Sequence, residues 1–381
     1  MSWLLLLYFF APVRAQWDVI WNPPNTNGCT TPDQKPGSCL QIYNCQPMLD
    51  FLDKVRQPIP PETEKHLKSY RCGTDRGKPK ICCPSGLIII DNEKLEDSIV
   101  FPDVSTHRNF RLLPKNCGHF DADNKIVNGE KTGLFEFPWM ALLSYRTRNG
   151  PQFKCGGTII NQKYILTAAH CLANLKTPLI GVRVGEHNIR TQKDCEFDKW
   201  NGEICAPPYQ DLGVEAVITH PEFSSRYLSN DIGLIRVSPI DLSQENSRPV
   251  CLPLAESRDY NFTNRNVFVA GWGITERGTP SPELLKVALP VVPLKECEDA
   301  YAKTARVDNR QLCAGGRNKK DSCGGDSGGP LHAQGRINGD TRLVQQGIVS
   351  FGPIRCGEVP IPGVYTRVAA FMDWILDNIE P

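Results

Sequence analysis

Sixteen cysteines, an even number, constrain this 381-residue chain more than any other feature of its sequence. Six of them fall within residues 29–83: Cys29, Cys39, Cys45, Cys72, Cys82 and Cys83. A stretch of about 60 residues buries too little apolar surface to be stable unaided, so disulfides are the expected reinforcement. A zinc cluster is the poorer alternative because the chain begins with a secretory pattern. Sequence alone does not choose among the possible pairings.

That secretory pattern is an apolar run at residues 3–10, followed by small and polar residues up to Ala15. It is too short to span a bilayer, which takes about 20 apolar residues, and it fits the core of a signal peptide. We therefore expect residues 1–15 to be a signal peptide and the protein to be secreted. No later apolar run reaches spanning length, so we expect no membrane anchor. A net charge of +1 and the lack of a long Lys/Arg run argue against a nucleic-acid partner.

The string DSCGGDSGGP at residues 321–330 has the composition of a catalytic serine loop. Ser327 stands among glycines, and Gly325 and Gly328 allow the backbone to turn and to approach a substrate carbonyl closely. A serine nucleophile also needs backbone N–H donors and a nearby base. A Gly/Ser loop without such a role is the alternative, but a ten-residue string of this composition favours the catalytic interpretation.

His170 is the histidine that best suits a base, because it closes the apolar segment YILTAAHC. Asp231 lies in the segment LSNDIGLIR, where a carboxylate adjoins an apolar strand. An unpaired carboxylate buried there would cost several kcal/mol, so a hydrogen bond to the histidine is expected.

The motifs LTAAHC, NDIGLI and GDSGGP, in the order His, Asp, Ser, resemble those of chymotrypsin-fold serine proteases. The resemblance implies that Ser327 is the nucleophile, His170 the general base and Asp231 its orienting partner. It also implies an oxyanion hole formed by the N–H groups of Gly325 and Ser327. For residues 126–381, short strands and Gly/Pro turns favour an all-β fold, and the family implies a double β-barrel. Apolar residues spaced along 368–379 predict a closing helix.

The cysteine-rich stretch, residues 28–83, resembles the clip domain that precedes the protease in many arthropod cascade enzymes. Two short helices are predicted, over 44–52 and from Pro60 onward. The two resemblances imply a set of disulfides: Cys29–Cys82, Cys39–Cys72, Cys45–Cys83, Cys117–Cys251, Cys155–Cys171, Cys297–Cys313 and Cys323–Cys356. Cys195 and Cys205 remain and are expected to close an inserted loop.

Residues 84–125 have scattered charge and weak periodicity, which is typical of a linker. Lys125 precedes the sequence IVNG and looks like a zymogen activation site. Cutting there would free the ammonium of Ile126 to neutralise Asp326, whose burial beside the nucleophile would otherwise be unfavourable. A surface turn before a strand is the alternative. The disulfide Cys117–Cys251 would keep the clip domain attached after the cut.

Asp321 lies six residues before Ser327, where the family places the floor of its primary pocket. A carboxylate there selects Arg or Lys. Gly352 and Gly363 would keep the pocket walls open to a long side chain. Phe351 departs from the tryptophan common at the pocket entrance.

The loop at residues 185–194 resembles the calcium loop of trypsin-like proteases. Hard oxygen ligands for Ca²⁺ would come from the carboxylates of Glu186 and Asp194 and the carbonyls of Asn188 and Thr191. A solvated polar loop is the alternative, and the chemistry itself needs no cofactor. Asn261, in the sequon Asn-Phe-Thr, is the expected glycosylation site.

These features predict a secreted zymogen that cleaves proteins after Arg or Lys in an extracellular cascade, of the Toll or prophenoloxidase-activating type. Its expected partners are protein substrates (a downstream zymogen or cytokine precursor), an upstream activating protease and a serpin inhibitor. A non-catalytic clip-domain homologue, acting as a cofactor or binding protein, is the alternative. The complete triad disfavours it.

Overall fold

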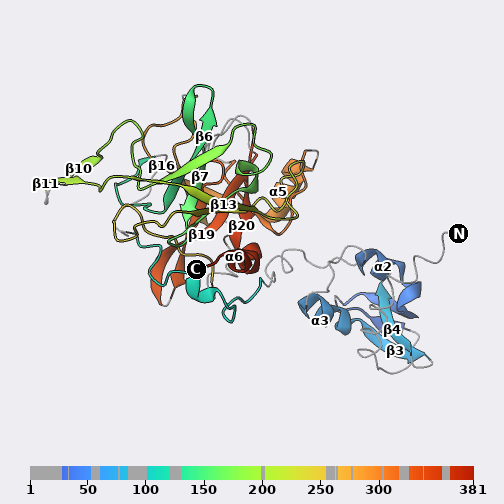
Figure 1. Cartoon of the computed structure of the whole chain (residues 1–381). Coiled ribbons are helices and arrows are strands. Elements are labelled where there is room, and N and C mark those ends of the chain that lie inside the picture. Colours follow the sequence, from blue (N-terminus) through green and yellow to red (C-terminus); the bar gives the residue numbers. More distant parts are fainter. Residues whose placement is uncertain are drawn as a thin grey trace. The chain divides into compact units, whose positions relative to one another are not determined.

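A computed structural model describes residues 28–32, 34–52, 61–75, 78–84, 101–120, 130–198, 202–254, 262, 265–275, 278–302, 304–316, 326–337, 339–353 and 361–381. The chain divides into two compact units, Met1–Ile99 and Val100–Pro381, which are described separately (Figure 1). The expected signal peptide, residues 1–15, lies outside the described residues. No helix in the described part of the chain is long and apolar enough to cross a membrane.

The first unit is a small sheet with two helices, held together by disulfides. Its strands are β1 (Gly28–Thr30), β2 (Pro36–Gln41), β3 (Arg71–Asp75) and β4 (Lys78–Pro84), in the order β1-β2-β4-β3. The helices are α2 (Gln46–Leu52) and α3 (Pro61–Ser69), and Pro61 fills a first-turn position where its missing N–H costs nothing. Met48, Leu67 and Ile81 form the centre of a very small core. Three disulfides reinforce it, with the pairing that the clip resemblance implied: Cys29–Cys82, Cys39–Cys72 and Cys45–Cys83.

The second unit contains two barrel-like antiparallel sheets. The first sheet has the order β12-β9-β6-β7-β8-β14-β13. Its strands are β6 (Met140–Thr147), β7 (Gly150–Ile159), β8 (Tyr164–Thr167), β9 (Leu179–Val184), β12 (Gln210–Leu212), β13 (Val214–Thr219) and β14 (Gly233–Val237). The four residues of β8 are all buried, as the apolar string before His170 predicted.

The second sheet has the order β15-β18-β19-β20-β17-β16-β5, and an additional pairing of β15 with β16 closes it. Its strands are β5 (Glu130–Lys131), β15 (Asn266–Gly271), β16 (Leu285–Val292), β17 (Gln311–Ala314), β18 (Pro330–Ile337), β19 (Asp340–Phe351) and β20 (Gly363–Arg367). Helix α5 (Leu294–Tyr301) precedes β17. A disulfide-closed hairpin, β10 (Cys195–Asp198) with β11 (Gly202–Cys205), forms a separate small sheet.

The closing helix, α6 (Met372–Asn378), follows a 3₁₀ turn, η5 (Val368–Phe371), and buries Met372, Ile375 and Leu376. The all-β double-barrel prediction with a C-terminal helix is therefore confirmed. A buried polar contact joins the two barrels: Trp139, which precedes β6, donates its indole N–H to His332 Nε2 on β18 at 2.6 Å. Burial lowers the pKa of His332 to about 3, so this imidazole is neutral at physiological pH.

Candidate active site

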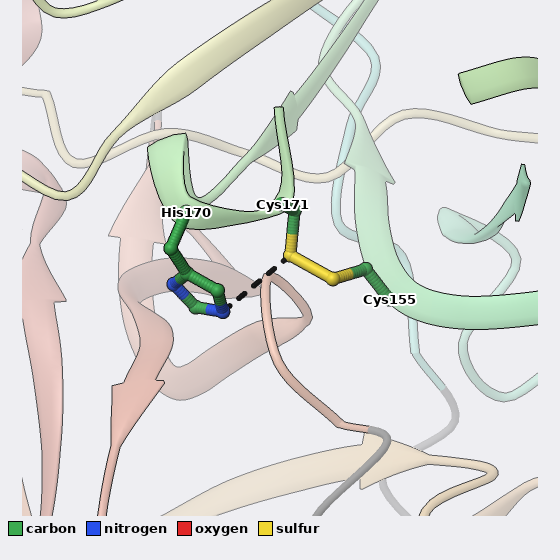
Figure 2. A group of neighbouring side chains, drawn as sticks. All are labelled: Cys155, His170 and Cys171. Atoms are coloured by element: carbon green, nitrogen blue, oxygen red, sulfur yellow. Dashed lines mark hydrogen bonds between the residues drawn. A yellow bond between two sulfur atoms is a disulfide. The ribbon is translucent and has the colours of Figure 1, made fainter. Parts of the chain in front are cut away.

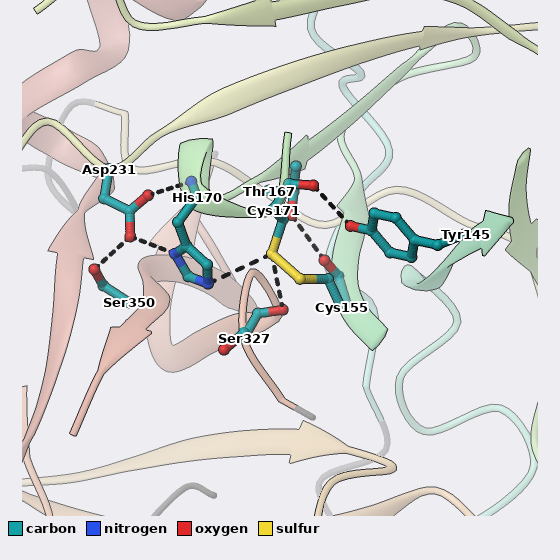
Figure 3. Close-up of a disulfide and its surroundings, with 9 residues drawn as sticks. Tyr145, Cys155, Thr167, His170, Cys171, Asp231, Ser327 and Ser350 are labelled. Atoms are coloured by element: carbon teal, nitrogen blue, oxygen red, sulfur yellow. Dashed lines mark hydrogen bonds and ion pairs between the residues drawn. A yellow bond between two sulfur atoms is a disulfide. The ribbon is translucent and has the colours of Figure 1, made fainter. Parts of the chain in front are cut away.

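The first barrel supplies a histidine and an aspartate whose backbone positions fix their contact. His170 lies in a 3₁₀ turn, η3 (Ala169–Cys171), directly after β8, and Asp231 lies just before β14. Strands β8 and β14 are antiparallel neighbours, with Thr167 at the end of β8 opposite Gly233 at the start of β14, so the two residues meet at the same end of this strand pair. His170 Nδ1 is 2.7 Å from Asp231 Oδ2, and the His170 backbone N–H donates to Oδ1 at 2.8 Å (Figure 3).

The Asp231 carboxylate is fully buried, and its oxygens accept hydrogen bonds from His170 and Ser350. Ser350 donates its hydroxyl to Oδ2 at 2.5 Å, from a β-bulge between Val349 and Phe351 that turns its side chain toward the site. Thr366, on β20, donates to the Asp231 carbonyl at 2.7 Å. A carboxylate held this way fixes the imidazole ring and stabilises it when it takes up a proton.

The second barrel supplies the serine loop. Ser327 lies just before β18, and its carbonyl accepts the N–H of Gly156 on β7 at 2.8 Å, which ties the two barrels together at the nucleophile. Gly328 has φ of +79°, and a Cβ there would collide with Thr167 and Gly156, so only glycine suits this turn.

The described residues place His170 and Ser327 beside the Cys155–Cys171 disulfide (Figures 2 and 3). Cys171 Sγ lies 3.6 Å from His170 Nε2 and 3.6 Å from the Ser327 carbonyl. Ser327 and His170 are both among the described residues, and the Ser327 hydroxyl forms no hydrogen bond to His170 in this structure. Such bonds commonly tighten only when substrate binds. Cys155, His170 and Cys171 lie close enough together to resemble a metal site. The two cysteines are bonded to each other, however, so the three residues form a disulfide beside a base.

Asp326 points toward the backbone of the second barrel. Its Oδ1 accepts the Gly273 N–H at 2.9 Å, and a side chain at Gly271 or Gly273 would collide with this carboxylate. The Gly329 N–H donates to the Asp326 carbonyl at 2.8 Å, which holds the loop in a tight turn. The absence of side chains at Gly271 and Gly273 therefore leaves space for the Asp326 carboxylate.

Two of the expected pocket residues are neighbours. A Cβ added to Gly352 would lie 3.7 Å from the Gly363 Cα, at the adjoining ends of β19 and β20. Phe351 packs edge-on against Tyr301, with ring centroids 5.4 Å apart, and the Tyr301 hydroxyl donates to the Pro362 carbonyl at 2.7 Å. Helix α5 thus braces this wall through an aromatic pair.

Seven of the sequence-predicted site residues lie outside the described part of the chain. They are Lys125, Ile126, Asp321, Gly325, Asn261, Cys323 and Cys356. The remaining implied disulfides, Cys117–Cys251, Cys155–Cys171 and Cys297–Cys313, are present, and Cys195 pairs with Cys205.

Ser350 and Thr366 are contacts of the site that sequence reasoning did not identify. A single hydroxyl near a strand end has no distinctive pattern, and the bulge that aims Ser350 is visible only in the structure.

The loop at residues 185–194 brings together the two carboxylates expected to bind calcium. Asp194 Oδ2 accepts the N–H groups of His187 and Asn188, at 3.2 and 3.0 Å. Glu186 is buried and accepts from Arg183 at 3.1 Å, while Arg183 also pairs with Asp211. Burial raises the pKa of Glu186, and the nearby Asp194 raises it further, against the lowering effect of Arg183. Arg183 is shared between Glu186 and Asp211, and the Glu186 and Asp194 carboxylates supply hard oxygen atoms of the kind that Ca²⁺ prefers.

Comparisons with known proteins agree with this architecture. The family described as "Trypsin" matches residues 126–375, and the family described as "Regulatory CLIP domain of proteinases" matches residues 29–83. The crystal structure of the Drosophila Grass clip serine protease of the Toll pathway superposes with a TM-score of 0.61 at 34% identity, covering 92% of this chain and 96% of that one.

Sequence relatives span nearly the whole chain. Serine protease grass of Drosophila melanogaster is 35% identical over 99% of this chain and 98% of its own length. Phenoloxidase-activating factor 1 of Holotrichia diomphalia is 39% identical, covering 93% and 94% respectively. Spaetzle-processing enzyme of Drosophila melanogaster is 36% identical, covering 93% and 92%. With a trypsin domain, a clip domain and a histidine–aspartate pair beside the serine loop, this chain belongs to the clip-domain serine proteases.

Proposed function

We propose that this protease is a secreted zymogen that cleaves after Arg or Lys and acts in an extracellular proteolytic cascade. The observation that carries the catalytic part is the buried Asp231 carboxylate, which holds His170 at 2.7 Å beside the Ser327 loop. Ser327 would attack the scissile carbonyl while His170 Nε2 takes its proton and later donates it to the leaving amine. The backbone N–H groups of Gly325 and Ser327 would bind the oxyanion.

The cascade role is supported by what the relatives are named for. Among them are a Spaetzle-processing enzyme and phenoloxidase-activating factors. By analogy, the substrate is a secreted zymogen or cytokine precursor, the activator is an upstream trypsin-like protease, and the inhibitor is a serpin. The test is to incubate the activated protein with candidate cascade proteins and to sequence the new N-termini. New termini that follow Arg or Lys in one such protein support the proposal, and uncut candidates contradict it.

Specificity gives the first separate prediction. Replacing Asp321 by Ser should abolish the preference for Arg and Lys, because the cation of the substrate would lose its counter-charge at the pocket floor. A peptide-library profile of the native and variant enzymes measures this. Gln334→Ala, on an exposed position of β18, is the matched control and should keep the native profile. A native enzyme that prefers aromatic residues would contradict the pocket assignment.

The expected calcium loop, residues 185–194, gives a second prediction. We propose that Glu186 and Asp194, with the carbonyls of Asn188 and Thr191, hold a structural Ca²⁺. At 100-fold excess over Kd, binding would add about 2.7 kcal/mol to the free energy of unfolding, or roughly 5–10 °C in melting temperature. Asp194→Asn should remove this shift, whereas Glu203→Gln, in the neighbouring hairpin, should keep it. Identical melting curves of the native protein with calcium and with chelator would remove the site.

A further inference from the structure

The residues just upstream of the proposed activation site are part of the catalytic unit. In Figure 1 the teal chain of residues 101–120 runs beside α6. Phe101 and Val104 are each 6% exposed and Leu113 is 9% exposed, and the last two belong to the main hydrophobic core of the unit. The Arg367 guanidinium lies over the Phe101 ring, 5.5 Å from its centroid. We call residues 101–120 the docked segment.

Polar side chains of the docked segment contact the C-terminal end of α6. The last carbonyls of a helix have no partner within the helix. Asn109 Nδ2 donates to two carbonyls at this end, Leu376 at 2.9 Å and Ile379 at 3.0 Å. His107 Nε2 lies 3.1 Å from Asp377 Oδ1 on the same helix. The docked segment therefore supplies hydrogen-bond partners for the end of α6. These contacts do not depend on the nearby Cys117–Cys251 disulfide.

The backbone of the docked segment is folded into consecutive turns. The N–H of His107 donates to the Val104 carbonyl, and the N–H of Phe110 donates to the His107 carbonyl. A 3₁₀ turn, η2 (Phe110–Leu112), follows. A bound peptide substrate pairs with an edge of a protease as an extended strand, so a segment held in turns has to open before it can be cut.

This matters because the docked segment contains three exposed basic residues, Arg108, Arg111 and Lys115. Each is a side chain that an Arg/Lys-directed protease would accept. A cut after any of them would break the covalent link between the clip domain and Cys117. That cut would remove the attachment that the disulfide provides.

We propose that docking of residues 101–120 against α6 has two effects. It confines activating cleavage to Lys125, and it holds the light chain, the part of the cut protein that ends at Lys125, on the catalytic unit without the help of Cys117–Cys251. The surface of α6 and Arg367 thus acts as the binding site for the light chain of the cut protein. The proposal rests on the proposed cut after Lys125. The experiment below is therefore run in a Ser327→Ala background, where an external protease does the cutting.

The first comparison measures protection. Limiting external trypsin is added to the native sequence, to Asn109→Ala and to Val104→Ala, all with Ser327→Ala, and cut sites are quantified by mass spectrometry. Asn109→Ala should raise cutting at Arg108, Arg111 and Lys115 by about 10- to 100-fold, because two helix-end carbonyls lose their donor and the open state becomes more populated. Val104→Ala should act in the same direction. Ser105→Ala, at an exposed position of the same segment, should change nothing.

A synthetic peptide of residues 101–120 gives the unprotected cutting rate. If the native protein is cut at the three basic residues as fast as this peptide, docking does not protect them and the proposal fails. Equal rates in Asn109→Ala and Ser105→Ala, with circular dichroism confirming that both are folded, would also overturn it.

The second comparison measures retention. Cys117→Ser/Cys251→Ser protein, cut by trypsin after Lys125, is passed over a native size-exclusion column. The fragment carrying residues 101–120 should coelute with the catalytic unit, and adding Asn109→Ala should release it. Separation of the fragment without Asn109→Ala would overturn retention. If trypsin does not cut after Lys125, the proposed activation site is wrong, and the protection experiment still decides whether the segment is docked.

Discussion

Replacing Ser327 by alanine should lower the amidase activity of the activated protein about 10⁴-fold or more, while the protein still folds and is secreted. His170→Ala and Asp231→Asn should have effects of the same order, because the three groups act as one unit in proton transfer. The measurement is hydrolysis of an Arg-amide substrate by equal amounts of cut protein, with thermal melting to verify folding. Near-normal turnover by folded Ser327→Ala protein would contradict the assignment of the nucleophile.

Ser350 provides a graded control for this prediction. Ser350→Ala removes one donor from the Asp231 carboxylate and leaves the 2.7 Å contact with His170 in place. A hydrogen bond to a charged group contributes about 1.5–3 kcal/mol, so the expected loss is roughly 10- to 150-fold. An effect as large as that of Ser327→Ala would mean that Ser350 does more than orient Asp231.

The parts of this site that sequence could predict are those with a strong local pattern. His170 and Asp231 stand beside apolar strands, where an unpaired polar group is unfavourable, and their pairing follows from that cost. The seven observed disulfides follow from family spacing, except Cys195–Cys205, which was left as the remaining pair. The closing helix was visible as an apolar repeat over residues 368–379.

The docked segment was not predictable in this way. Residues 84–125 looked like a linker because the charges are scattered and the apolar residues show no repeat. Its attachment rests on a few buried side chains and on Asn109, which reaches carbonyls 267 and 270 residues away along the chain. Contacts this distant in sequence, made by a single side chain, leave no periodic signal. Ser350 escaped prediction because a β-bulge, which sequence does not reveal, sets its direction.

Activation should fail in Lys125→Gln. The uncut Ile126 nitrogen would be a neutral amide, so Asp326 would receive no ammonium and the oxyanion hole would not form. Removing one partner of a buried ion pair costs about 3–5 kcal/mol, which corresponds to roughly a 10²- to 10⁴-fold loss of the active form. Asp326→Asn should give a loss of similar size even after cutting, because the Ile126 ammonium would then be the unpaired partner.

The measurement pairs an amidase assay with a denaturing gel, before and after treatment with an upstream trypsin-like protease. Native protein should gain activity on cutting, and its two chains should separate on the gel only with reductant, because Cys117 is bonded to Cys251. Lys115→Gln is the matched control: it removes an exposed basic residue of the docked segment and should activate normally. Full activity in uncut Lys125→Gln protein would show that the zymogen mechanism is wrong. Loss of the light chain on a denaturing gel without reductant would place the cut before Cys117, so that Lys125 would not be the activation site.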